Sequence, residues 1–320
     1  MRRLGAGRAR LIWAAVIPIV LWVLVRALGL ERGFPLVPLI AYTPYLTVPA
    51  LLGLAVAAAL RNWAAAIVAA LALGGLVTVL LPRAVGDAEA VPPDAVPLDV
   101  LSVNIHHGTA SVGDLLEMVE RREAEILSVQ ELTPKFAREL ERRGIERLLP
   151  HRVVSVRRGA AGGGVYSSLA LRRLTAPPLA AIRMPRASVR LPDGGSVRVV
   201  AVHPYPPNRS SVDLWRAGLD SLPATNPAGP PWILAGDFNA TLDHAELREI
   251  LDSGYRDAAE VTGEGLTPTW PARRRILPPV TIDHILADPR ICIADYAVET
   301  LLGSDHRTVY ARLAVPDTKE

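Results

Sequence analysis

The chain has 320 residues, of which 50% are hydrophobic and 21% are charged, a composition that excludes an intrinsically disordered protein. Its formal net charge of +3 hides a segregation. Residues 1–83 carry eight arginines and one acid, whereas residues 84–320 carry 27 basic and 31 acidic side chains and are therefore −4 overall. A net negative domain does not suit a protein that binds nucleic acid through general positive charge. The single cysteine, Cys292, excludes an internal disulfide and a cysteine-based zinc site.

Three apolar runs occupy residues 11–30, 36–60 and 63–81. Each reaches the roughly 20 residues that cross a bilayer core of about 30 Å. We therefore expect residues 1–83 to form an all-α membrane anchor of three transmembrane helices, with the lipid bilayer as its partner. Three prolines, Pro38, Pro44 and Pro49, lie in the second run, so a re-entrant segment stays open as the alternative.

Basic residues at the ends of these runs predict the orientation of the anchor. Four arginines lie within residues 2–10, and Arg61 separates the second run from the third. An excess of arginine marks the cytoplasmic side, so three crossings place the rest of the chain outside the cell membrane. If the second run does not cross, the rest of the chain lies inside. We expect Arg26, near the end of the first run, to extend toward the membrane interface.

Residues 84–96 include Pro92 and Pro93, which predict an extended tether. We expect this tether to hold a second domain, residues 97–315, near the membrane without fixing its orientation. Residues 316–320 are then a tail.

Polar residues gather at the ends of predicted strands in this second domain. Strands over residues 97–103 and 125–130 flank a helix that begins near Ser111, and they end at Asn104 and Glu131. Neighbouring strand ends of this kind often build sites in α/β sheets. Other predicted strands end in, carry or follow His203, Asp237, Asn239, Asp283, Asp305 and His306.

These residue types suit hydrolysis at a phosphorus centre. Carboxylates and an amide are good ligands for a hard divalent cation, and a histidine beside an aspartate suits acid–base catalysis. The reaction needs a base for the attacking water, neutralisation of the phosphoryl charge, and stabilisation of the leaving oxygen. The pattern therefore indicates a metal-dependent phosphoesterase.

In chain order, the motifs resemble those of the endonuclease/exonuclease/phosphatase superfamily. They are Asn104, Gln130-Glu131, His203, Gly236-Asp237-Phe238-Asn239, Ile282-Asp283-His284 and Ser304-Asp305-His306. The resemblance covers about residues 97–315. It implies an α/β four-layer sandwich with two packed mixed β-sheets. It also implies Mg²⁺ as the cofactor, or Mn²⁺, with Glu131 as the principal ligand and Asn104 and Asp305 close by.

The same resemblance implies roles for five catalytic residues. Asp237 orients or deprotonates the attacking water, and Asn239 holds the transition-state oxygens. His203 and His306 contact the phosphate, and Asp283 orients His306. Whether Asp237 or His306 is the general base stays open.

Other polar residues have less specific signals. Trp270 and the run Arg273-Arg274-Arg275 precede the Asp283 strand and are candidates for substrate binding, although an arginine run is usually solvated. We interpret His106 and His107 as loop residues with at most a lining role, and His151 and His244 as surface residues. We expect His284 to pack or to support the site.

Features outside the catalytic motifs bear on the identity of the substrate. The hydrophobic front end, the Thr-Trp-Pro segment at residues 269–271 and the Ile-Asp-His motif also resemble the membrane-anchored VanJ-type branch of the superfamily. That branch is associated with teicoplanin resistance and with a polyprenyl pyrophosphate substrate. A lipid-linked phosphate or pyrophosphate is therefore the favoured substrate. A membrane-tethered nuclease and a non-catalytic membrane scaffold stay open as alternatives, and we expect no obligate protein partner.

Overall fold

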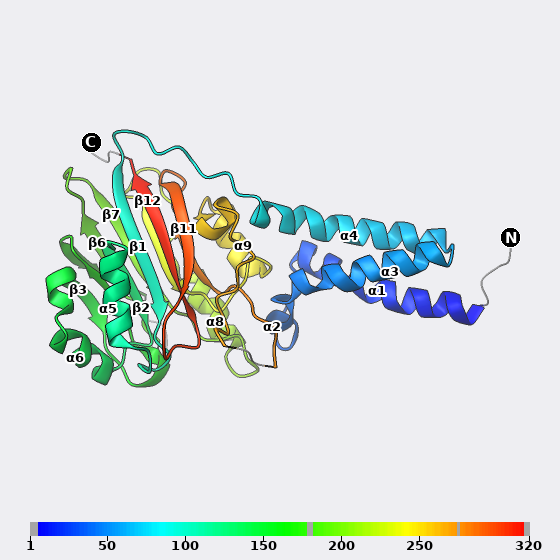
Figure 1. The fold of residues 1–320 in the computed structure, drawn as a ribbon, viewed down its shortest axis with the longest axis horizontal. Helices are drawn as coiled ribbons and strands as arrows, with labels where there is room; N and C mark the ends of the chain where they lie inside the picture. Colours follow the sequence, from blue (N-terminus) through cyan, green and yellow to red (C-terminus); the bar gives the residue numbers. More distant parts are fainter. Residues whose placement is uncertain (1–5, 178–181, 274–275, 317–320) are drawn as a thin grey trace.

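A computed structural model describes residues 6–177, 182–273 and 276–316. The chain folds into a helical bundle and an α/β domain (Figure 1). The bundle segment contains α1 (Ala6–Leu28), α2 (Leu36–Ile40), the 3-10 turn η1 (Thr43–Leu46), α3 (Thr47–Ala59) and α4 (Trp63–Ala84).

Two mixed sheets of six strands form the centre of the α/β domain. The first sheet contains β1 (Val96–Asn104), β2 (Ile126–Gln130), β3 (His151–Ser155), β4 (Gly163–Ser167), β11 (Cys292–Thr300) and β12 (Arg307–Val315). The second contains β5 (Leu171–Leu174), β6 (Arg186–Arg190), β7 (Ser196–Val202), β8 (Trp232–Asp237), β9 (Arg256–Asp257) and β10 (Asp283–Ala287). Their strand orders are β11-β12-β1-β2-β4-β3 and β5-β6-β7-β8-β10-β9. Each sheet has one parallel pair, β1 with β2 and β7 with β8.

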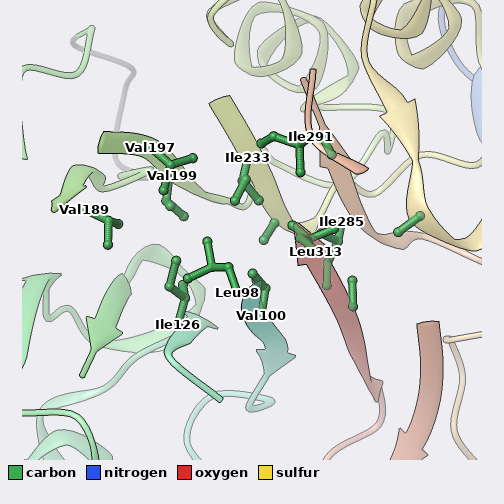
Figure 2. Packing of buried hydrophobic residues seen from close by; sticks show 14 of the residues in the cluster. Leu98, Val100, Ile126, Val189, Val197, Val199, Ile233, Ile285, Ile291 and Leu313 are labelled. Atoms are coloured by element: carbon green, nitrogen blue, oxygen red, sulfur yellow. The ribbon is translucent and has the colours of Figure 1, made fainter. Parts of the chain in front are cut away.

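The sheets pack face to face around a core of aliphatic side chains. Figure 2 shows Val197 and Val199 of one sheet pointing toward Leu98 and Val100 of the other. Successive residues of a strand point to opposite faces, so Val200 of β7 lies on the outer face instead.

Helices cover the outer faces of both sheets. Helices α5 (Val112–Arg121), α6 (Pro134–Arg142) and α7 (Ile145–Leu148) pack on the first sheet, and α8 (Val212–Asp220) and α9 (Ala245–Asp252) pack on the second. The short elements η2 (Gly159–Ala161) and α10 (Ala258–Val261) complete the domain. Ser111 caps α5 as expected, since its side chain accepts a hydrogen bond from the Asp114 amide at 3.3 Å. The predicted four-layer α/β sandwich is confirmed.

Two helices of the bundle, α1 and α4, are long and apolar enough to cross a bilayer. The second expected span is not a single helix, because residues 36–60 divide into α2, η1 and the 13-residue α3. Pro38 and Pro44 account for this break, since proline lacks the amide hydrogen that a continuous helix needs. Three transmembrane helices are therefore not confirmed. In Figure 1, α1, α3 and α4 lie side by side and extend away from the α/β domain.

A buried ion cluster attaches the bundle to the α/β domain, and we call Arg26, Arg83 and Asp243 the docking cluster. Arg26 Nε and Arg83 NH1 each lie 2.9 Å from an oxygen of Asp243. The Arg26 side chain, which we expected to extend toward the membrane interface, is buried against the α/β domain. Gly29 follows α1 in the left-handed region (φ 61°), and a Cβ there would lie 3.3 Å from Ala245 Cβ, so glycine suits this close approach.

The segment predicted to be a free tether also packs on the domain. The Asp87 amide donates to the Val261 carbonyl at 2.8 Å, and Glu89 forms an ion pair with Arg256. Residues 86–92 have no regular secondary structure, and a turn at residues 93–95 leads into β1. These contacts hold part of the segment against the domain.

Candidate active site

The topology of the first sheet places Asn104 and Glu131 side by side. Strands β1 and β2 are parallel, Asn104 pairs with Gln130, and Glu131 follows directly. Strand β12 runs antiparallel to β1, so His306, the residue before β12, lies at the same edge. The Ser304 hydroxyl fixes this approach by donating to the Asn104 carbonyl at 2.7 Å.

The second sheet contributes three residues to the same edge. His203 follows β7 and Asp237 ends the parallel β8, while Asp283 begins the antiparallel β10 and pairs directly with Asp237. A Cβ on Gly236 would lie 1.9 Å from the Val202 carbonyl oxygen. Only glycine permits this close approach of β8 to β7, which explains the first residue of the Gly-Asp-Phe-Asn motif.

Several residues of this edge have unusual backbone geometry. Glu131 (φ 62°) and Asn239 (φ 49°) lie in the left-handed region, as do His106 and His107. Such conformations are costly for residues other than glycine and concentrate where a site requires them.

The amide of Asn104 joins two buried carboxylates. Its Nδ2 donates to Asp237 Oδ2 at 3.0 Å and to Glu131 Oε1 at 3.3 Å. His107 Nδ1 lies 2.9 Å from the other oxygen of Glu131. The pKa of Asp237 is raised, chiefly by burial and further by the Asp283 carboxylate, although His306 and His203 act to lower it.

His306 and Asp283 form a buried pair next to Asp237. His306 Nδ1 donates to Asp283 Oδ2 at 3.0 Å, and its Nε2 lies 3.7 Å from Asp237 Oδ2. Burial alone lowers the pKa of His306, but the carboxylates of Asp283 and Asp237 outweigh it and raise the pKa to about 10. A protonated His306 cannot take a proton from water at neutral pH, so Asp237 is the better candidate for the base.

His203 and Asn239 complete the cluster. His203 Nε2 lies 3.7 Å from Asp237 Oδ2 and 3.8 Å from Glu131 Oε1. The backbone N–H of Asn239 donates to Asp237 Oδ1 at 2.8 Å, and its side-chain Nδ2 donates to the Pro204 carbonyl at 3.2 Å. These contacts orient the Asp237 carboxylate, so that its Oδ2 faces both imidazoles.

The donor atoms fit a hard divalent cation. Glu131 and Asp237 are buried carboxylates that converge on one amide, an arrangement that a cation would stabilise. A second group, Asp237, Asp283 and His306, offers ligand atoms within 4.8 Å of one another. We favour the Glu131 side, because it pairs two buried carboxylates, whereas Asp283 of the second group is paired with the cationic His306.

The other predicted residues lie toward the edge of the cluster. Trp270 Nε1 donates to Asp305 Oδ2 at 3.3 Å, and the Trp270 ring lies 6.3 Å from the ring of His306. Asp305 is partly exposed, and His106 Nδ1 lies 3.8 Å from it. Arg273 is exposed. Arg274 and Arg275 lie outside the described residues.

The cluster opens into a cavity of about 650 Å³. The polar residues that line the cavity include the candidate catalytic residues Glu131, His203, Asp237, Asn239 and His306, together with His107, His244, Arg158 and Asn208. The larger part of the lining is apolar, with Phe34, Pro38, Ala41, Tyr42, Ile182, Tyr205, Pro206, Trp270, Leu277, Val280 and Ile282.

Two histidines lie closer to the site than their motifs predict. His107 contacts Glu131 and lines the cavity. His244, expected on the surface, is 1% exposed and also lines the cavity, since the Thr241 amide turns its ring inward by donating to Nδ1 at 2.9 Å. His284 is buried as expected, with Nδ1 2.6 Å from Asp257 Oδ2. The position of His107 three residues after Asn104 was the only sequence signal for these contacts.

Two packed mixed sheets that bring carboxylates, an amide and histidines to one edge define a metal-dependent phosphoesterase. The chain belongs to the endonuclease/exonuclease/phosphatase family, whose pattern matches residues 101–306. No curated protein matches the chain significantly.

Solved structures share this fold at low sequence identity. Humanized TDP2 from D. rerio superimposes with a TM-score of 0.54 at 18% identity and covers 68% of this chain and 98% of its own. The 3′ phosphatase NExo from Neisseria, bound to a product DNA hairpin, gives a TM-score of 0.53 at 19% identity and covers 67% and 98%. An AP endonuclease from Archaeoglobus fulgidus gives 0.54 at 16% identity and covers 69% and 100%.

Proposed function

We propose that this protein is a membrane-anchored, Mg²⁺-dependent phosphoesterase that hydrolyses a lipid-linked phosphate or pyrophosphate, such as a polyprenyl pyrophosphate, at the outer membrane surface. One observation carries the proposal. The candidate catalytic cluster opens into a largely apolar cavity, and part of its wall comes from the segment that connects the apolar helices. A hydrocarbon chain beside a phosphate suits such a cavity better than a nucleotide does.

The chain's own residues suit the chemistry of this reaction. Asp237 Oδ2 accepts a proton from the attacking water, and Asn239 holds the adjacent loop and the phosphoryl oxygens. His306, kept protonated by Asp283, stabilises the charge that develops on the phosphate, and His203 contributes from the opposite side. A Mg²⁺ ion held by Glu131 and Asn104, with Asp305 at the edge, would supply Lewis-acid activation of the phosphoryl oxygens.

The arrangement of the bundle supports an extracytoplasmic domain. The start of α1 and the turn at Arg61 lie at the end of the bundle far from the α/β domain (Figure 1). The arginines that mark the cytoplasmic side therefore lie opposite the catalytic domain. A cysteine introduced at the exposed Ala88, in a Cys292→Ser background, should react with an impermeant maleimide in intact cells. Labelling only after lysis would refute this orientation.

The substrate is tested with the purified full-length protein in detergent micelles. Phosphate release from a polyprenyl pyrophosphate and nicking of plasmid DNA are compared with Mg²⁺, with EDTA, and with Glu131→Gln. We expect phosphate release that EDTA and Glu131→Gln abolish, while the Glu131→Gln protein keeps its melting temperature. Glu139→Gln, an exposed change on α6, is the matched control and should keep full activity.

The same experiment distinguishes the alternatives. DNA nicking that depends on Mg²⁺ and Glu131, without phosphate release, would make the protein a tethered nuclease. Full activity of Glu131→Gln would remove Glu131 from the metal site. A VanJ-type role in glycopeptide resistance follows from this proposal only if the polyprenyl substrate is hydrolysed.

A further inference from the structure

The first part of the second apolar run packs into the α/β domain rather than into the bundle. Val37 of α2 is fully buried in the same apolar cluster as Trp215 of α8 and Phe238 of the Gly-Asp-Phe-Asn motif. Ala41 packs against Val280 and Ile282. The first part of the second apolar run is therefore fixed against the catalytic domain.

Polar contacts fix the same segment at its end. The Tyr45 hydroxyl donates to the Pro279 carbonyl at 2.6 Å, and the Thr43 hydroxyl accepts from Trp22 Nε1 of α1 at 3.0 Å. The segment is thus held between a helix of the bundle and the loop that precedes β10.

Four side chains of this segment form a wall of the active-site cavity. Phe34, Pro38, Ala41 and Tyr42 line the same cavity as the candidate catalytic residues. Phe34 is 47% exposed. A guanidinium, that of Arg209, lies 5.5 Å from the centre of the Phe34 ring. Exposed aromatic surface next to a catalytic cluster gains from contact with an apolar ligand.

Other apolar residues line the same cavity. Leu277, which is 51% exposed, and Ile182 line it together with Tyr205. The cavity therefore joins the candidate catalytic residues to a largely apolar lining. Its lining residues come from both the 34–42 segment and the α/β domain, so the cavity lies where these two parts meet.

We propose that residues 34–42 of the anchor form a hydrocarbon subsite that receives the units of the lipid chain beyond the one attached to the scissile phosphate. This inference rests on the proposed function and adds to it that the anchor determines specificity. Phe34 and Tyr42 contact the chain, while Val37 positions the segment. Without this segment, the catalytic domain keeps its reacting groups but lacks one wall of its substrate site.

The test compares two diphosphates that differ only in the length of the isoprenyl chain, one unit against three. Phe34→Ala and Tyr42→Ala, in the full-length protein, should raise KM for the longer substrate by about tenfold, as expected for a lost apolar contact. Their kcat, and their KM for the shorter substrate, should stay at the wild-type values. Leu39→Ala is the matched control, because Leu39 is an exposed residue of the same 34–42 segment and is not among the residues that line the cavity.

The outcomes separate this inference from the function on which it rests. If wild-type protein hydrolyses the longer diphosphate but Phe34→Ala and Tyr42→Ala behave like Leu39→Ala, the subsite is refuted and the proposed function stands. An equal rise in KM for both substrates would also refute the subsite. If wild-type protein hydrolyses neither diphosphate, the proposed function and the subsite fail together.

Discussion

Replacing Asp243 with asparagine tests how firmly the helical bundle is attached to the α/β domain. The Asp243 side chain has no exposed surface and accepts three hydrogen bonds of 2.9 Å, one from Arg26 Nε and two from Arg83. Burial raises the pKa of Asp243, but the two guanidinium groups outweigh it and hold the pKa below its usual range. The carboxylate is therefore charged at neutral pH.

The expected cost follows from the burial of its partners. The Arg26 and Arg83 side chains are 11% and 4% exposed, so Asp243→Asn leaves two nearly buried cations without their anion. Removing one partner of a buried ion pair costs about 3–5 kcal/mol. These contacts all join the bundle to the domain, so the substitution should mainly weaken the association of the bundle with the domain. The separated state should become roughly a hundredfold to a few thousandfold more populated.

Trypsin cleavage after Arg83 measures this opening. Arg83 is buried, and its carbonyl accepts from the Gly265 amide at 3.0 Å, so cleavage requires separation. Cleavage of Asp243→Asn in micelles, followed by mass spectrometry, should be at least a hundredfold faster than in wild-type protein. Glu139→Gln should match wild type, because it removes only the surface ion pairs with Arg142 and Arg143, which lie on α6 and next to it, away from the docking cluster. A difference of less than tenfold between Asp243→Asn and wild type would show that the docking cluster contributes little.

Further predictions concern the catalytic cluster. Asp237→Asn should lower kcat by about 10²–10⁴-fold while Mg²⁺ binding persists, and a loss below tenfold would exclude Asp237 as the base. His306 must stay protonated, so kcat should fall as the pH rises through about 10, and the alkaline limb should be absent in His306→Gln. With EDTA present, the free energy of unfolding should also fall as the pH rises from 6.5, the ordinary pKa of histidine, to about 10. The stability that protonated His306 contributes is complete below this window and lost above it, because its pKa is raised in the folded protein. A pH-independent difference between wild type and His306→Gln would contradict the assignment.

Local patterns predicted the strand ends of the catalytic domain because a few adjacent residues determine them. Asn104 and Glu131 each follow a short apolar strand, and Ser111 lies at the spacing of a helix cap. Residues that form contacts but lie far apart in the sequence leave no comparable local pattern. Arg26 and Asp243 are 217 positions apart, and an arginine at the end of an apolar run reads equally well as an interfacial residue.

The second apolar run shows a different limit. A run of apolar residues has the same composition whether it crosses a bilayer or packs into a protein core. Pro38 and Pro44 indicated a break but did not indicate what the freed segment would contact. The burial of Val37 against Trp215 and Phe238 depends on residues far along the chain, so it emerged only from the three-dimensional structure.

The burial of Val37 in the core of the α/β domain also affects how the bundle and the domain can be exchanged by recombination or separated in recombinant fragments. A recombination event that joined this α/β domain to a different N-terminal helical bundle would uncover an apolar surface on Trp215 and Phe238. The two parts should therefore be exchanged among related proteins as one unit, with the crossover before α1 rather than near residue 84. For the same reason, a recombinant fragment that starts at residue 97 should aggregate, and a useful soluble version would have to retain residues 34–45 by fusion.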